Sequence, residues 1–131
     1  MSGYREGTEI LKSRHVEIEG AARALMGNFS LDADKDQNES AWFQARMLTA
    51  AFALYLERDE VTPDAWKSAG YLGNLLALKG KVNRLMASLW YKVAPNGNAE
   101  KPIDNALDAI NYAAFFARLY EAGDERGKPW D

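Results

Sequence analysis

The stretch KPIDNALDAINYAAFFARLY, residues 101–120, constrains the fold of this chain more than any other part of it. Pro102 suits the first turn of a helix, because the N–H that proline lacks has no partner there. Apolar side chains then recur at steps of three and four, which places them on one face of a helix. They are Ile103, Leu107, Ile110, Ala114 and Ala117. The pattern predicts a long helix with one buried face, which Gly123 ends.

A second stripe, made of Asp104, Asp108 and Asn111, runs beside that apolar face at the same helical steps. Carboxylate and amide oxygens one turn apart are suitable ligands for a hard divalent cation such as Mg²⁺. Asp104 has another explanation, because an acidic side chain in the first turn complements the helix dipole. Asp108 lies beyond that turn. We therefore interpret Asp104 and Asp108 as candidate catalytic residues and metal ligands, and keep a purely structural role for Asp104 open.

The composition favours one all-helical domain. In a chain of 131 residues, 47% apolar residues are enough to form a core, and no segment alternates apolar and polar residues as a strand would. A net charge of −3 provides no positive field for nucleic-acid phosphates, so we expect no binding to nucleic acid. The absence of cysteine excludes disulfides, and no apolar run is long enough to cross a membrane. We expect a cytoplasmic protein, with residues 1–131 as one domain and residues 1–6 and 123–131 as flexible ends.

Four helices are predicted, and their short connections favour an antiparallel four-helix bundle. They cover residues 7–26, 39–58, 62–92 and the stretch from Pro102, with loops at 30–38 and 94–100. Thr62, Pro63 and Asp64 provide the start signal of the third helix. The second helix is apolar over more than half its circumference, which is typical of a central helix or of one that pairs with another subunit. We therefore expect a homodimer or higher homo-oligomer, which could complete the bundle.

Other charged residues extend the candidate site. Glu57 and Glu60 share one face near the end of the second helix, where acidic groups oppose the helix dipole. They could join Asp104 and Asp108 as metal ligands, although a solvated helix end explains them equally well. Lys81 and Arg84 lie at helical spacing on the third helix. An ammonium and a guanidinium fork together can bind phosphate oxygens, while the alternative is an ordinary exposed pair.

The segment Lys81-Val82-Asn83-Arg84-Leu85, followed by Glu100 and by DNALDAINY at residues 104–112, resembles a pattern of a phage and bacterial family. That pattern is K-x-x-R-L and then E-x-x-x-D-x-x-x-D-x-x-N-Y. The family is the nucleotide-modification-associated domain, distantly similar to all-α nucleoside triphosphate pyrophosphatases such as MazG and the dimeric dUTPases. The resemblance covers residues 75–121, about a third of the chain.

The resemblance implies an Mg²⁺-dependent nucleotide-binding protein of a bacterium or an infected host cell. Its active form would hydrolyse a nucleoside triphosphate to the monophosphate and pyrophosphate. Asp104 and Asp108 would then lie near the metal, and Lys81 and Arg84 near the phosphates. Asn111 would either contact the base or support the metal ligands without binding the metal itself. The glutamate-rich E-E-x-x-E segment of the pyrophosphatases has no clean copy here, and Glu57 and Glu60 replace it only in part. The alternative is a non-catalytic interaction or regulatory protein of phage or bacterial origin.

Overall fold

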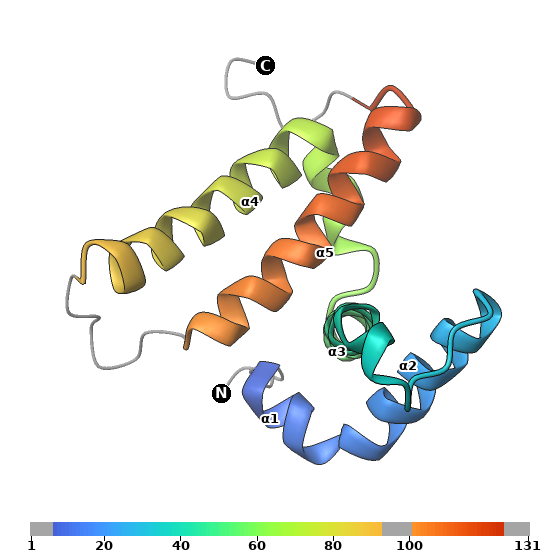
Figure 1. Cartoon of the computed structure of the whole chain (residues 1–131). Helices are drawn as coiled ribbons and strands as arrows, with labels where there is room; N and C mark the ends of the chain where they lie inside the picture. The colour runs from blue at the N-terminus through green and yellow to red at the C-terminus, as the bar shows by residue number, and fades with distance from the viewer. Residues whose placement is uncertain (1–6, 93–100, 125–131) are drawn as a thin grey trace.

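The computed structural model describes residues 7–92 and 101–124, and every regular element in these ranges is helical. The α-helices are α1 (Gly7–Ser13), α2 (His15–Asn28), α3 (Glu39–Val61), α4 (Gly70–Leu85) and α5 (Pro102–Glu121) (Figure 1). Two 3₁₀ turns cover Asp36–Asn38 and Ala65–Ala69, and a π-helical turn, Met86–Trp90, extends α4. The prediction of an all-helical protein is confirmed. The predicted loop at 94–100 and most of both predicted flexible ends lie outside the described residues.

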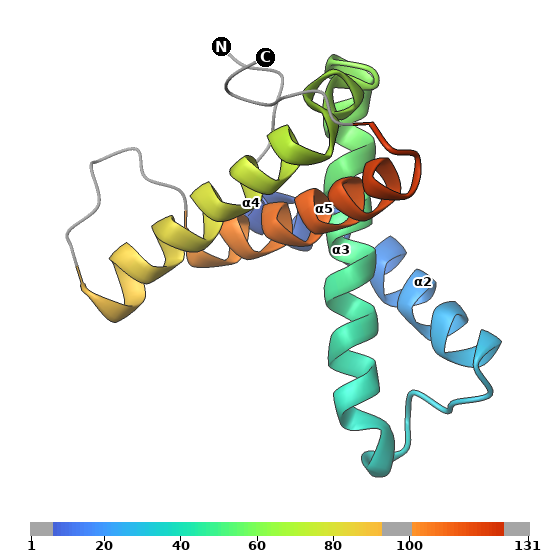
Figure 2. The ribbon, with the colours of Figure 1, turned by 90° about the horizontal axis from the view of Figure 1, so that it is seen from above.

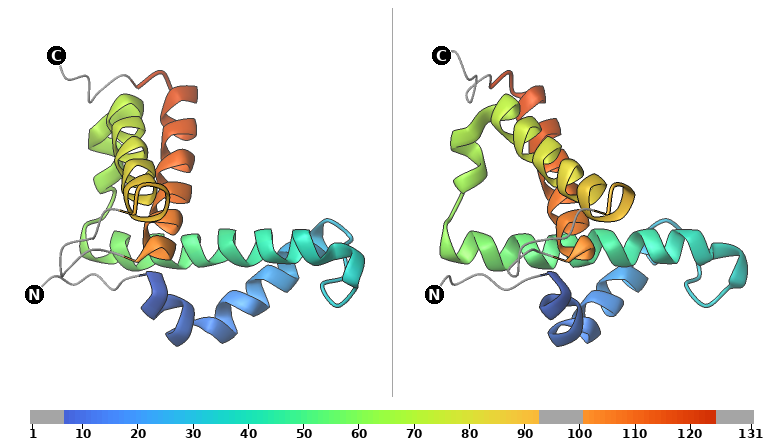
Figure 3. Two further views of the ribbon diagram at one scale, coloured as in Figure 1. Left: turned by 60° about the vertical axis from the view of Figure 1, so that its left-hand side comes forward. Right: turned by 90° about the vertical axis from the view of Figure 1, so that its left-hand side faces the viewer.

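The helices form a hairpin that stands across a central helix. α4 and α5 lie side by side and run in opposite directions, as Figures 1 and 2 both show. Figure 1 views α3 end-on while α4 and α5 lie in the plane of the picture, so α3 crosses the hairpin. Figure 3 shows α1 and α2 on the opposite side of α3 from the hairpin. An antiparallel bundle of four helices within one chain is therefore not confirmed. No described helix is both long enough and apolar enough to cross a membrane.

Two of the predicted helices are interrupted, for different reasons. The helix predicted at 7–26 is divided at Arg14, whose backbone leaves helical geometry at φ −113° and ψ 22°. The helix predicted from Thr62 does not start there, because Asp64 has a φ of 55° and Gly70 a φ of 66°. A positive φ cannot continue a right-handed helix. The α-helix consequently begins only at Gly70, and it then passes through Gly80 without interruption.

The end of α5 agrees with the prediction and explains how the hairpin is held together. Gly123 has a φ of 71°, and its N–H donates to the carbonyl of Tyr120 at 3.0 Å. The N–H of Asp124 donates to the carbonyl of Leu119 at 3.0 Å, which completes a Schellman motif. The carbonyl of Asp124 then accepts a 2.9 Å hydrogen bond from the N–H of Tyr71. The end of α5 is thereby attached to the start of α4.

The main core lies where α1, α2, α3 and α5 meet. It consists of Ile10, Ile18, Ala50, Ala51, Ala53, Leu54 and Leu107, with Ile103 and Ile110 packed against it. A smaller cluster of Ala22, Met26 and Ala45 joins α2 to α3. The apolar face predicted for α5 is buried only in its first half, and Ala114 and Ala117 are exposed.

The contact between α1 and α5 yields a prediction at Gly7. A Cβ at this buried position would lie 2.8 Å from Leu107 Cδ1 and 2.9 Å from Asp104 Oδ1. Gly7→Ala is therefore expected to lower the free energy of unfolding by about 1–3 kcal/mol, the usual cost of overpacking. Gly20→Ala is the matched control: a Cβ there meets no atom within 4 Å, so alanine should stabilise α2 by about 0.5–1 kcal/mol. Urea unfolding measures the free energy of unfolding of both variants. Changes of equal size and sign would contradict the close contact of Gly7 with α5.

Candidate functional site

Asp108 is a buried charged residue that joins three helices. It projects from α5 with an exposed fraction of 2%. Its Oδ1 accepts a 2.6 Å hydrogen bond from Arg58 Nη1, on α3. Lys81 Nζ, on α4, lies 2.9 Å from Oδ2 without hydrogen-bond geometry, so this contact is an ion pair. One carboxylate therefore lies between two cationic groups and links α3, α4 and α5.

Asp104 is equally buried, but its partners are backbone groups. Its Oδ1 accepts the N–H of Thr8 at 2.7 Å, and its Oδ2 accepts the N–H of Lys101 at 3.2 Å. The second bond caps the start of α5, so the structural role that the sequence left open for Asp104 is observed. The first bond attaches α1 to α5. Both carboxylate oxygens therefore have partners within the fold.

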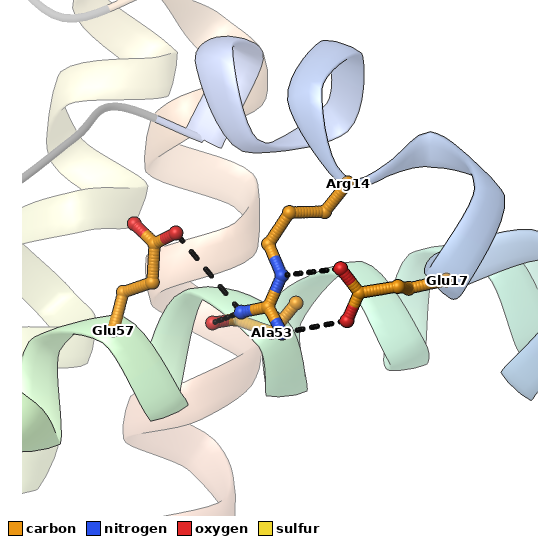
Figure 4. A network of polar contacts seen from close by, with 4 residues as sticks. All are labelled: Arg14, Glu17, Ala53 and Glu57. Carbon is orange, nitrogen blue, oxygen red and sulfur yellow. Dashed lines mark hydrogen bonds and ion pairs between the residues drawn. The ribbon is translucent and has the colours of Figure 1, made fainter.

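Glu57 and Glu60 do not form one cluster of metal ligands with Asp104 and Asp108. Figure 4 shows the Glu57 carboxylate directed toward Arg14, with Oε1 4.0 Å from Nη1. The same guanidinium lies 3.4 Å from the carbonyl of Ala53 and 2.9 Å from Glu17 Oε2. Glu60 is exposed. In residues 7–92 and 101–124, no three His, Asp or Glu side chains gather as a metal site requires.

The Arg14 network yields a prediction about acid. The hydrogen bond and the charge of Arg14 hold the pKa of Glu17 below its ordinary value. The pair therefore stabilises the folded protein above the unfolded pKa, about 4.3, and this contribution is lost as pH falls through the lower folded pKa. In Arg14→Ala, the pKa of Glu17 should return to the ordinary range, and NMR titration measures this change. A pKa that does not move would mean that Arg14 is not its partner.

The predicted phosphate-binding pair is separated. Lys81 is buried against Asp108, whereas Arg84 is exposed. Arg84 accepts a 3.0 Å hydrogen bond from Ser88 Oγ at its backbone carbonyl. Asn111, the third residue predicted to bind substrate, donates from Nδ2 to the carbonyl of Ala51 at 2.9 Å. Lys81 and Arg84 thus do not form a joint binding site for a phosphate.

A cavity of about 370 Å³ lies between α3, the Ala65–Ala69 turn, α4 and α5. Its walls include Asp108 and Asn111 of the predicted site, with Arg58 beside them. The other lining residues are Tyr55, Asp59, Thr62, Ala65, Trp66, Ala69, Gly73, Asn74, Ala77, Tyr112 and Phe115. Asn74 is buried and holds the wall together, because its Nδ2 donates to the carbonyls of Trp66 at 3.0 Å and Gly70 at 2.8 Å.

Aromatic rings form much of this cavity. Trp66 and Phe115 stack with ring centroids 4.8 Å apart and planes 11° apart. Tyr55 and Tyr112 also contact Phe115, with centroid distances of 5.7 and 6.2 Å. The indole Nε1–H of Trp66 is buried and finds no hydrogen-bond acceptor among the described residues. A buried donor without an acceptor costs free energy.

Sequence reasoning missed several of these residues. Arg58, Trp66 and Phe115 have no motif or spacing in the sequence that marks them as site residues. One available signal is the stripe of small residues Ala69, Gly73, Ala77 and Gly80, which predicts that a neighbouring helix approaches closely. Ala69, Gly73 and Ala77 also line the cavity.

The residues predicted to bind Mg²⁺ do not fit the ion in this arrangement. Mg²⁺ needs oxygen ligands in near-octahedral geometry, but the oxygens of Asp104 and Asp108 already have partners, and two of those partners are cations. No protein-family model, curated protein or solved structure matches the chain. The resemblance to the nucleotide-modification-associated domain therefore stays a prediction.

Proposed function

We propose that this chain binds a nucleotide in the cavity between α3, α4 and α5. The observation that carries the proposal is the combination, in one cavity, of an aromatic wall and a cationic side chain, that of Arg58. The cavity volume, about 370 Å³, lies within the range of small-molecule sites. The proposal concerns nucleotide binding. The test below also measures whether the nucleotide is hydrolysed.

The aromatic wall suits a planar base. Stacking of a base on an aromatic side chain contributes about 1–3 kcal/mol, and it does not depend on which base is bound. Asn111 and Asn74 supply further polar surface in the same cavity. A planar base that stacks on the rings and contacts these amides is therefore the ligand that the cavity favours.

Arg58 suits the charged part of a nucleotide. Its side chain is 31% exposed, so the guanidinium reaches the cavity while its Nη1 stays bonded to Asp108. A guanidinium offers five N–H donors, and phosphate oxygens accept them well. Asp108 would then hold Arg58 in position rather than bind a metal. Mg²⁺, if it accompanies the nucleotide, would be held chiefly by the phosphates.

The test is calorimetric titration of the purified chain with ribonucleoside and deoxyribonucleoside triphosphates, with and without Mg²⁺. Ala77→Phe would fill the cavity from α4 and should abolish binding. Ala24→Phe, at an exposed position of α2, adds the same ring elsewhere and should leave binding unchanged. Pyrophosphate release in the same samples separates hydrolysis from binding. Binding that survives Ala77→Phe in a folded protein, or no binding of any nucleotide, overturns the proposal.

A second candidate function is a non-catalytic interaction protein. Leu48, Phe52 and Leu56 recur at steps of four on α3, and all three side chains are exposed. An exposed apolar stripe of this kind is typical of a protein-binding surface. Thermal stability that rises with protein concentration, without any effect of nucleotide or Mg²⁺, would favour this function over nucleotide binding.

A further inference from the structure

The charged side chains at the cavity wall balance one another. Within residues 7–92 and 101–124, the wall contains the guanidinium of Arg58 and the carboxylates of Asp59 and Asp108. Lys81 contacts the same group from α4, with its Nζ 2.9 Å from Asp108 Oδ2. These four side chains carry two positive and two negative charges. A phosphate that enters the cavity therefore meets one guanidinium in a wall that is neutral as a whole.

A second cation, beside the aromatic wall, is balanced in the same way. Lys67 Nζ lies 5.7 Å from the centre of the Trp66 ring, which is a cation–π distance. The same ammonium lies 3.4 Å from Asp64 Oδ2, and both side chains are exposed. Water and salt screen an exposed pair of this kind. Lys67 therefore adds no net positive charge to the cavity.

The surroundings of Arg58 suit one phosphate group better than three. Its Nη1 lies 2.6 Å from Asp108 Oδ1, and Asp59 is the next residue along α3. Asp59 Oδ1 accepts the N–H of Asp64 at 2.8 Å, which fixes this carboxylate at the wall. One phosphate gains charge-assisted hydrogen bonds from the guanidinium. Each further phosphate adds negative charge beside two carboxylates, and like charges repel.

We infer that the cavity recognises a nucleotide through a single phosphate group, so that its preferred ligand in the absence of a metal is a nucleoside monophosphate. The inference rests on the proposed nucleotide site and names the class of nucleotide that this site selects. A triphosphate then binds best as its Mg²⁺ complex, because the metal offsets part of the charge of the phosphates.

Arg84 distinguishes this inference from a site that extends along α4. It lies seven residues after Ala77 of the cavity wall, on the same side of the helix and about 10 Å further along its axis. Its side chain is exposed. A triphosphate that reached from the cavity to Arg84 would bind more tightly than a monophosphate. Recognition of one phosphate gives Arg84 no part in binding.

Calorimetric titration tests the inference with the common ribonucleosides and deoxyribonucleosides and with their 5′-mono- and triphosphates. In a chelating buffer, a monophosphate should bind about tenfold more tightly than its nucleoside, the equivalent of one hydrogen bond to a charged group. It should also bind at least as tightly as the triphosphate. Mg²⁺ should raise the affinity for the triphosphate and leave that for the monophosphate unchanged.

Three variants locate the phosphate. Arg58→Gln should lower the affinity for the monophosphate to that for the nucleoside. Asp59→Asn removes one carboxylate from the wall and should raise the affinity for the metal-free triphosphate, which provides a second readout if Arg58→Gln does not fold. Arg84→Gln should change none of these affinities.

The outcomes separate this inference from the proposed function. A metal-free triphosphate that binds more tightly than the monophosphate, or that loses affinity in Arg84→Gln, overturns the single-phosphate inference and leaves a nucleotide site in place. A monophosphate that binds no better than its nucleoside also overturns it. If no nucleoside or nucleotide binds, the proposed function fails, and the inference fails with it.

Discussion

Asp108→Ala is expected to lower the free energy of unfolding by about 3 kcal/mol. The substitution leaves Lys81 buried and Arg58 partly buried without the carboxylate that both contact. Removal of one partner from a buried ion pair costs about 3–5 kcal/mol, and the lower end applies because the Arg58 side chain is 31% exposed. Chemical denaturation in a chelating buffer measures the change. Asp108→Asn keeps the size of the side chain and isolates the effect of its charge.

The same experiment separates a structural carboxylate from a metal ligand by the sign of the effect. Carboxylates gathered around an absent cation repel each other, so neutralising one would not destabilise the metal-free protein. A double-mutant cycle of Asp108→Asn with Lys81→Met should show a coupling of about 0.5–3 kcal/mol, because the two residues are in direct contact. Asp108→Asn as stable as the wild type in chelator, with loss of an Mg²⁺-dependent stabilisation, would contradict the structural role.

Asp104→Ala is expected to have an effect of similar size, about 3 kcal/mol. The carboxylate accepts the backbone N–H groups of Thr8 and Lys101, and hydrogen bonds to a charged group contribute about 1.5–3 kcal/mol each. Hydrogen exchange should show loss of protection at the amide of Thr8, since α1 is no longer attached to α5. Asp104→Asn keeps one acceptor oxygen and should cost less than alanine. Protection that survives in Asp104→Ala would mean that this contact does not hold α1.

The boundaries of α5 were predictable because their signals are local. Pro102 fits the first turn, and Gly123 adopts the positive φ that ends the helix. The interruptions at Arg14 and Asp64 were not predictable in the same way. Arg14 contacts the carbonyl of Ala53, which is distant in sequence, and Asp64 adopts a left-handed conformation that its residue type permits without requiring.

Some residues of the candidate site could be predicted from the sequence, but the partners of those residues could not. Asp108 was identified from its place beside an apolar face, and it is both buried and at the wall of the cavity. Its partners lie on α3 and α4, so no local spacing reveals that Lys81 would bind a carboxylate rather than a phosphate. Arg58 has no local signal either, because Asp108, its partner, lies 50 residues away in the sequence.

The most direct test of nucleotide binding in the cavity is an NMR titration that follows the indole N–H signals of the tryptophans. On addition of a nucleoside triphosphate, the Trp66 indole signal should shift and saturate, because the ring of Trp66 lines the cavity. The side-chain amide of Asn111 should shift with it, while the Trp42 indole, which packs with the α2–α3 cluster, should not move. A Trp66 signal that stays in place at nucleotide concentrations that shift other residues would contradict the account.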